Sequence, residues 1–461
     1  QLHHLGREVR VRIETDGQRH LADDLAHAAH EFAFEIEERV GRAGAVQIEI
    51  DAVERAFRRG EIRVLCATST LALGVNLPAK NVILAERWKW RYSRRYNKWI
   101  RDDLTKCEYD GMSGRAGRLG LCDPVRNFGR SLLLAPSRFD ADVWLRTLVD
   151  APVQALEPTL LGKPLGDVIL DLVASALGRD EAEIIDVLLS TFTGHTRWAR
   201  LPGRTAFAES IGTTIGDLVR NDLLARDEDS GTLSVTGAGR VCARKGLMVR
   251  SVVLLARWAD AAAPLDVVFT PLEVLLLCAL TPDGGEAHVP LTLPEHRFGD
   301  YWTRILLRAQ ELGAADRRLF RWLRDQAGRL TYDQTKAVKK ALLLMDWVDS
   351  HDSAAIERDH SVWSGAVAHA AADFAWLVES LADLCDARGW PSERTGELVK
   401  LAERLRYGVD DNLLSLARAT SKVLPRTHLQ RVAAAGLTSE DALMAADPQV
   451  LERAVGRGRI W

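Results

Sequence analysis

The chain has 461 residues, which predicts three or four domains at about 100–200 residues each. Its formal net charge is −3, so any binding of nucleic acid must depend on local positive charge, and the balance of 47% hydrophobic and 27% charged residues excludes wholesale disorder. The six cysteines form no CxxC pair, so we expect no metal site, no disulfide framework and a cytoplasmic protein. No apolar run approaches the roughly 18 residues that span a bilayer, so we expect no membrane partner.

The N-terminal third indicates an α/β lobe. Residues 1–50 carry no motif and are left unassigned. From Ala52 to Arg59 the spacing of apolar residues predicts a helix. Short apolar runs at 62–67, 81–85 and 130–134 predict buried strands, with helical stretches between them. This alternation predicts an α/β lobe over residues 51–150.

Three prolines predict a linker near residues 150–165, and the chain beyond it is mostly helical. In residues 151–250, helices are followed by a turn and a strand at 232–235, which favours a winged helix. Residues 251–415 contain long amphipathic helices. Residues 416–461 form short helices separated by turn residues.

A pair of arginines stands beside a pair of glycines in the segment MSGRAGR. Arg115 and Arg118 are three residues apart and would share one face of a helix. Gly114 and Gly117 cost a helix about 1 kcal/mol each, which favours a close approach of backbone and ligand. Arginines placed beside a transferring phosphoryl group accelerate the reaction by about 10³–10⁵. A basic surface helix with incidental glycines is the alternative.

The segment ATSTLALGVNLPA begins where a predicted strand ends, at the edge where α/β sheets bind ligands. Its hydroxyl side chains, Thr68, Ser69 and Thr70, suit phosphate oxygens. Gly74 and Asn76 belong to a tight turn. The alternative is an ordinary strand-to-helix turn with a capping hydroxyl.

Together, in this order and about forty residues apart, these segments resemble motifs V and VI of superfamily 2 helicases, the DEAD/DEAH-box type. The GVNLPA form resembles the Ski-like branch, although many relatives have Gln where Gly111 stands. The resemblance implies a partial second RecA-like lobe over residues 51–150, and residues 1–50 are not expected to match the family. It implies nucleic-acid contacts by Thr68, Ser69 and Thr70, and coupling to ATP through Gly74, Asn76, Gly114 and Gly117. It implies that Arg115 and Arg118 are the catalytic residues that reach the phosphates of ATP.

Cations and aromatic rings alternate in residues 87–101, between the two motifs. Cations attract phosphates, and each ring offers a stacking face worth about 1–3 kcal/mol per base. The expected nucleic-acid contacts are Trp88, Lys89, Trp90, Arg91, Arg94 and Arg95. In related helicases a β-hairpin at this place separates the strands, and we expect the same here. The alternative is a sheet-edge hairpin whose aromatic residues pack on the lobe.

The remaining chain resembles the family more weakly. The resemblance implies a winged helix in 151–250 and a helical ratchet domain in 251–415, where Trp376 stacks on a base and His369 lies on the same helix face. It also implies a helix-hairpin-helix-like tail in 416–461, with Arg426 as a phosphate contact. A core role for Trp376 and a small capping bundle for the tail are the alternatives.

The loop that grips ATP is not found in the sequence. Phosphoryl transfer in this class needs GxxxxGK[ST] and an acidic motif that binds Mg²⁺. The 461 residues contain no such loop, and the acidic run Asp180–Glu183 is predicted to open a helix instead. We therefore expect ATP and Mg²⁺ to be held mainly by a first lobe, in cis or in trans, and the chain alone to be inactive.

The predicted function is that of an ATP-dependent helicase portion that translocates on single-stranded or forked DNA, 3′ to 5′, and unwinds duplex. DNA is favoured over RNA. The alternative is a non-catalytic DNA- or RNA-binding module without its own ATPase.

Overall fold

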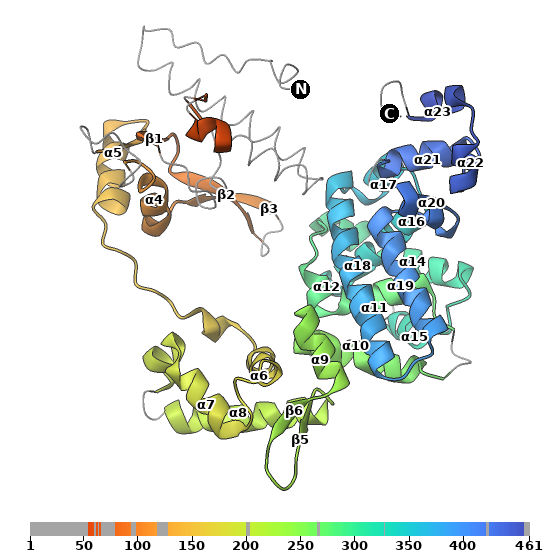
Figure 1. Cartoon of the computed structure of the whole chain (residues 1–461), viewed down its shortest axis with the longest axis horizontal. Coiled ribbons are helices and arrows are strands. Elements are labelled where there is room, and N and C mark those ends of the chain that lie inside the picture. Colours follow the sequence, from red (N-terminus) through yellow and green to blue (C-terminus); the bar gives the residue numbers. More distant parts are fainter. Residues whose placement is uncertain are drawn as a thin grey trace. The chain divides into compact units, whose positions relative to one another are not determined.

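The computed structural model describes residues 54–59, 61–62, 64–65, 79–93, 98–117, 128–199, 203–264, 268–326, 328–420 and 424–455. The chain divides into two compact units, Gln1–Leu156 and Glu157–Trp461 (Figure 1). The boundary lies inside the predicted linker, where residues 152–158 belong to no helix or strand. Among the described helices, none is both long and apolar enough to cross a membrane.

The first unit is built on a parallel pair of strands. β1 (Asn81–Leu84) pairs with β4 (Arg130–Leu133), so both strands were predicted correctly from their apolar runs. The strand predicted at 62–67 is wrong where it is described, because residues 62, 64 and 65 lie outside any strand. Residues 54–58 are helical, as predicted.

Helices accompany this strand pair. α4 (Lys106–Ser113) starts at a capping box in which Thr105 and Glu108 satisfy each other's backbone N–H groups. α5 (Arg138–Trp144) continues into a π-helical turn, Leu145–Val149. Among the described residues of the unit, a small core contains Leu84, Leu104, Tyr109, Met112 and Leu148.

An antiparallel hairpin joins β1 to α4. β2 (Trp88–Ser93) pairs with β3 (Lys98–Asp103), with Trp90 opposite Arg101. The hairpin predicted for residues 87–101 is therefore confirmed, and it forms a separate two-stranded sheet (Figure 1).

The second unit opens with helices followed by a short antiparallel hairpin. After a 3₁₀ turn (Thr159–Gly162), the elements are α6 (Leu165–Ala174), α7 (Glu181–Ser190), a π-helical turn (Gly194–Trp198), α8 (Gly203–Arg220), β5 (Leu224–Arg226), β6 (Leu233–Val235) and α9 (Gly237–Lys245). The strand predicted at 232–235 is confirmed as β6. Asp180 is the N-cap of α7, so the acidic run opens a helix as predicted.

A helical body follows, with α16 and α18 in its core. Its elements are α10 (Val249–Ala262), α11 (Pro271–Leu280), α12 (Pro282–Glu286), α13 (Leu293–Phe298), α14 (Tyr301–Glu311), α15 (Arg318–Asp325), α16 (Tyr332–Val348), α17 (Ser353–His360), α18 (Ser364–Ala387) and α19 (Ser392–Tyr407). α18 packs along α19, and α11 packs against α16. One continuous hydrophobic core extends from α6 to α19.

The tail has its own small core. A 3₁₀ turn (Asp411–Leu413) leads into α20 (Leu414–Thr420), followed by α21 (Arg426–Ala434), α22 (Glu440–Met444) and α23 (Pro448–Val455). Leu414, Leu416, Leu429, Val432 and Val455 are among the side chains buried together there.

Candidate nucleic-acid interface

One face of the β2–β3 hairpin carries aromatic and cationic side chains that pack against one another. Alternation along a strand places Trp88 and Trp90 on the same face, where cross-strand pairing adds Arg101. The two indole rings meet edge to face with centroids 5.4 Å apart, and the Arg101 guanidinium lies 4.2 Å from the Trp88 ring. Trp90 remains 49% exposed. The arrangement is a fixed aromatic platform that a nucleic-acid base can stack on.

Three further cations among the described residues of the hairpin segment pair with carboxylates. Arg91 pairs with Asp102 at 2.6 Å, and Lys89 pairs with Glu108 of α4. Arg87 pairs with Asp103. Each of these three cations thus has an acidic partner in the fold, and the nucleic-acid contacts expected of Lys89 and Arg91 remain predictions.

Glu108 shows how closely the hairpin is tied to the lobe. Partial burial raises the pKa of Glu108, but hydrogen bonds from Lys89 and from the backbone and side chain of Thr105 outweigh it and leave the pKa lowered. The carboxylate that begins α4 therefore also anchors the hairpin. Lys89 has a structural role here, and Arg91, which is more exposed, keeps a weak surface pair.

The described part of the arginine–glycine segment is held by backbone contacts. α4 ends at Ser113, and Ala79 forms a parallel bridge with Ala116 through hydrogen bonds to Arg115 O (3.1 Å) and from Gly117 N (2.9 Å). The end of the first motif is thus joined directly to the second.

This geometry corrects the expected helical face. Arg115 lies beyond the last residue of α4, and Gly117 has a left-handed φ of +70°. A methyl group on Gly117 would overlap the backbone of Gly129. The glycine therefore allows two backbone segments of this chain to approach each other, which is a different reason from the predicted approach of a ligand.

Several predicted site residues lie outside the described residues. They are Thr68, Ser69, Thr70, Gly74, Asn76, Arg94, Arg95 and Arg118. Arg115, Gly114, Gly117, Trp88, Lys89, Trp90 and Arg91 are described, and all belong to the first unit.

In the second unit, Trp376 lies on α18 with its side chain partly buried against the helical core. His369, two turns earlier, is exposed, and the seven-residue spacing places both on one face as predicted. Asp373 stands between them. Burial raises the pKa of Asp373, and the nearby His369 opposes this rise. A ring that is only partly covered keeps an accessible edge for stacking.

Arg426 has a different place from the one predicted. At the start of α21, its guanidinium donates to Gly408 O (2.6 Å), His351 O (2.6 Å) and Ser353 Oγ (2.8 Å), and it lies 4.1 Å from the Trp347 ring. Burial lowers the pKa of Arg426 to about 10. Its donors are used within the fold, so it is unsuited to the predicted phosphate contact.

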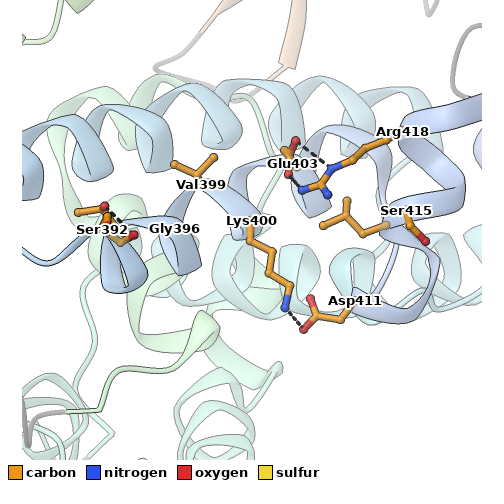
Figure 2. A pocket seen from close by; sticks show the side chains of 10 residues that line it. Ser392, Gly396, Val399, Lys400, Glu403, Asp411, Ser415 and Arg418 are labelled. Carbon is orange, nitrogen blue, oxygen red and sulfur yellow. Dashed lines mark hydrogen bonds and ion pairs between the residues drawn. The ribbon is translucent and has the colours of Figure 1, made fainter.

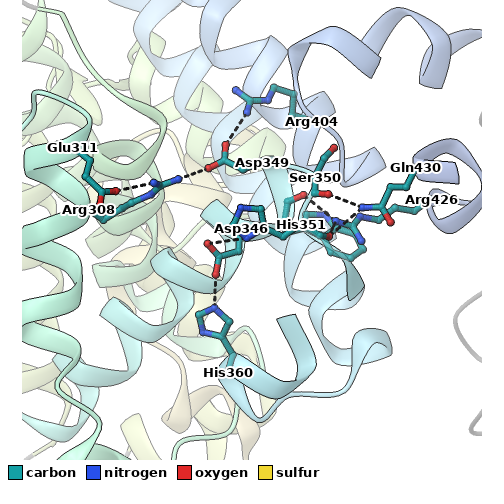
Figure 3. Close-up of polar contacts among 11 residues, drawn as sticks. Arg308, Glu311, Asp346, Asp349, Ser350, His351, His360, Arg404, Arg426 and Gln430 are labelled. Carbon is teal, nitrogen blue, oxygen red and sulfur yellow. Dashed lines mark hydrogen bonds and ion pairs between the residues drawn. The ribbon is translucent and has the colours of Figure 1, made fainter. Parts of the chain in front are cut away.

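Figure 3 shows the polar network around this side chain. The segment that follows α16 lies at the centre of this network. There, Gln430 Nε2 of α21 donates to Ser350 O (2.8 Å). Asp349 accepts from Arg308 of α14 (2.7 Å) and pairs with Arg404 of α19 (3.5 Å). The tail is thereby fastened to the helical body through α16.

A shallow pocket of about 480 Å³ lies between α19 and α20 (Figure 2). Its charged lining is internally paired: Lys400 contacts Asp411 at 2.8 Å, and Arg418 donates to Glu403. Such a lining presents no net charge to a ligand. In the described part of the chain, acids, histidines and cysteines form no group of three suited to hold a metal ion.

Comparisons with known proteins match both units. Residues 11–120 match the helicase conserved C-terminal domain, and residues 274–408 match domain 4 of archaeal helicases. The first match includes residues 11–50, although residues 1–50 were expected not to match the family. The second covers α16 and α18.

Similar proteins include ATP-dependent DNA helicases named Hel308. The one from Caldivirga maquilingensis is 26% identical over 98% of this chain and 57% of its own length. The one from Aeropyrum pernix is 28% identical over 79% of this chain and 44% of its own length. The chain thus spans about half the length of these relatives. The domain matches and these relatives together indicate the C-terminal portion of a superfamily 2 helicase.

Proposed function

We propose that this chain is a portion of an ATP-dependent DNA helicase of the Ski-like branch. It binds the nucleic acid and supplies the residues that complete the ATPase site. It moves along single-stranded DNA 3′ to 5′ and opens duplex at the β2–β3 hairpin. The observation that carries this proposal is the exposed Trp90, fixed beside Trp88 and Arg101 in a lobe that matches the helicase C-terminal domain. The Hel308 relatives, which are DNA helicases by name, favour DNA over RNA.

The ATPase role of the chain rests on its arginines. Arg115 and Arg118 would stabilise the charge that develops on the phosphates of ATP and Mg²⁺ held by a first lobe, in cis or in trans. The bridge between Ala79 and Ala116 supports coupling, because a shift in either motif is transmitted through backbone hydrogen bonds. The sequence contains no GxxxxGK[ST] loop, so the chain completes an ATP site that it does not form alone.

The second unit would guide the strand. We propose that residues 165–250 form a winged helix, since helices lead there into a two-stranded hairpin. Trp376 on α18 would stack on a base of the translocating strand, in the region that matches domain 4 of archaeal helicases. The tail would act as a helix-hairpin-helix-like cap on this strand, through backbone groups and without Arg426.

Binding of single-stranded DNA by Trp90→Ala tests the proposal. Loss of one stacked base predicts an affinity about five- to hundredfold lower, from about 1–3 kcal/mol per base. Phe139→Ala removes an aromatic ring that is 75% exposed on α5 of the same unit, and it should leave the affinity unchanged. Trp90→Phe should retain most of the binding. If Trp90→Ala bound as tightly as the wild type, the hairpin platform would not grip the strand.

A further inference from the structure

α15 carries a row of arginines on its outer surface. Arg318, Arg321 and Arg324 recur every three residues and are exposed. The apolar side chains of the same helix, Phe320 and Leu323, are fully buried. The helix thus turns its apolar side inward and presents guanidinium groups outward.

This row is unfavourable for the helix itself. Arg318 stands at the N-terminus of α15, the positive end of the helix dipole, where acids are stabilising and cations are not. Like charges three residues apart also repel each other. These electrostatic effects give no reason for Arg318 or Arg321 in the isolated helix, and an anionic ligand would remove both penalties.

Other arginines of this segment have a structural role, because their guanidinium groups contact partners within the fold. Arg317 pairs with the buried Glu273 at 3.0 Å, and Arg324 donates to Ala315 O at 2.5 Å. Across the part of the chain that the structure describes, no ion pair involves Arg318 or Arg321, although Asp325 lies one turn from Arg321. These two cations remain available to a ligand.

The kind of anionic ligand is indicated by whether exposed aromatic rings lie beside the arginines. Sites for single strands combine cations with exposed rings, as the β2–β3 hairpin does. On α15 the aromatic residues point into the core: Phe320 is buried, and the Trp322 side chain packs partly against it. In a duplex the base faces are covered by stacking and the phosphates are exposed. A surface with exposed cations and no exposed aromatic rings, such as that of α15, is therefore suited to a duplex.

We propose that Arg318 and Arg321, on the outer surface of α15, bind the phosphate backbone of duplex DNA, as a contact additional to those that bind the single strand. Successive arginines are separated by about 4.5 Å along the helix axis, so their long side chains reach neighbouring phosphates of one strand, about 3.4 Å apart along the duplex. The contact is independent of base sequence. It rests on the proposed helicase function, and it gives the protein a hold on the unopened part of a fork.

The test is fluorescence anisotropy of the full chain with blunt duplex DNA and with a single strand of equal length, over a range of salt concentrations. Arg318→Gln with Arg321→Gln removes two phosphate contacts. Duplex affinity should fall about tenfold near 0.1 M salt, and the slope of log K against log salt should become shallower by about 1.8. Single-strand binding should stay at the wild-type level. Arg257→Gln with Arg358→Gln is the matched control, since both are exposed arginines of the helical body.

Thermal unfolding checks that the variant folds, and its melting temperature should be unchanged or raised, since the repulsion is relieved. Duplex affinity and salt slope equal to those of the wild type would overturn the proposal. Equal losses of duplex and single-strand affinity in the double variant would also overturn it. If the double variant kept its duplex affinity but lost binding of poly-glutamate, the arginines would bind an acidic protein partner and the proposal would be overturned. Absence of all DNA binding by the wild type would instead refute the proposed helicase function.

Discussion

Replacing Arg426 with alanine should loosen the tail from the helical body. The guanidinium makes short hydrogen bonds to the carbonyl oxygens of Gly408 and His351, and it stacks on Trp347. Each hydrogen bond from a charged group contributes about 1.5–3 kcal/mol, and the cation–π contact about 1 kcal/mol. Desolvation of the charge, which lowers the pKa of Arg426 to about 10, offsets part of this sum. We expect a net loss of about 3 kcal/mol in the free energy that holds α21 in place.

Hydrogen exchange measured by mass spectrometry follows this loss segment by segment. In Arg426→Ala, amides of α21 should exchange about a hundredfold faster, because about 3 kcal/mol corresponds to about two powers of ten. Arg431→Ala, an exposed position on the same helix, is the control and should exchange like the wild type. Arg426→Lys keeps the charge but not the fork of donors, so it should resemble the alanine variant.

A phosphate contact at Arg426 predicts the reverse pattern. Exchange in α21 would then be unchanged, DNA affinity would fall in Arg426→Ala, and Arg426→Lys would bind nearly as well as the wild type. That result would refute the structural role that the hydrogen bonds of Arg426 indicate.

Gly117→Ala should destabilise the first unit by about 1–3 kcal/mol, because φ is +70° and a methyl group would overlap the backbone of Gly129. Thermal unfolding measures this, and Gly396→Ala, with open space around its Cα, should be neutral or stabilising; equal behaviour of the two variants would contradict the close approach. Burial lowers the pKa of Lys340 in the folded protein from 10.5 to about 7. Between about pH 7 and 10.5 the Lys340 amine is therefore protonated in the unfolded chain but largely neutral in the folded one, so the free energy of unfolding should rise with pH in this range. Urea unfolding of Lys340→Met should lack this rise, which is at most about 1.4 kcal/mol per pH unit; an identical pH dependence in wild type and variant would contradict the assignment. Trp376→Ala should bind single-stranded DNA about five- to hundredfold more weakly, by anisotropy, and unchanged affinity in a folded variant would exclude the stacking role.

Local sequence signals were enough for many elements of the fold. The apolar runs located β1 and β4, the acidic run beginning at Asp180 located the start of α7, and long amphipathic patterns located α16 and α18. The alternation of residues 87–101 predicted a hairpin. In each case the signal lies within one element, where side-chain periodicity and capping act over a few residues.

The site depended on contacts that no local pattern contains. Lys89 meets Glu108 only because the hairpin folds back on α4, and Gly117 needs its left-handed φ only because Gly129 comes beside it. Arg426 was predicted to contact phosphate from its sequence neighbours, whereas its partners include carbonyl groups 18 and 75 residues away. Charge alone does not distinguish a cation that binds a ligand from one that joins two helices inside the fold.

The same distinction divides the arginines of α15 and its N-cap. Arg317 and Arg318 are adjacent in sequence, yet one pairs with a buried carboxylate and the other faces outward. The sequence shows the basic character of the segment, and the structure shows which of its charges are already satisfied.

The decisive measurement is ATP hydrolysis by the purified chain, with and without single-stranded DNA, alongside binding of the same DNA. We predict tight DNA binding with no hydrolysis by the chain alone, and DNA-stimulated hydrolysis when a first helicase lobe is supplied in trans, lost again in Arg115→Ala. DNA-stimulated hydrolysis by the chain alone, or a complemented activity indifferent to Arg115→Ala, would contradict the proposed division of the ATP site.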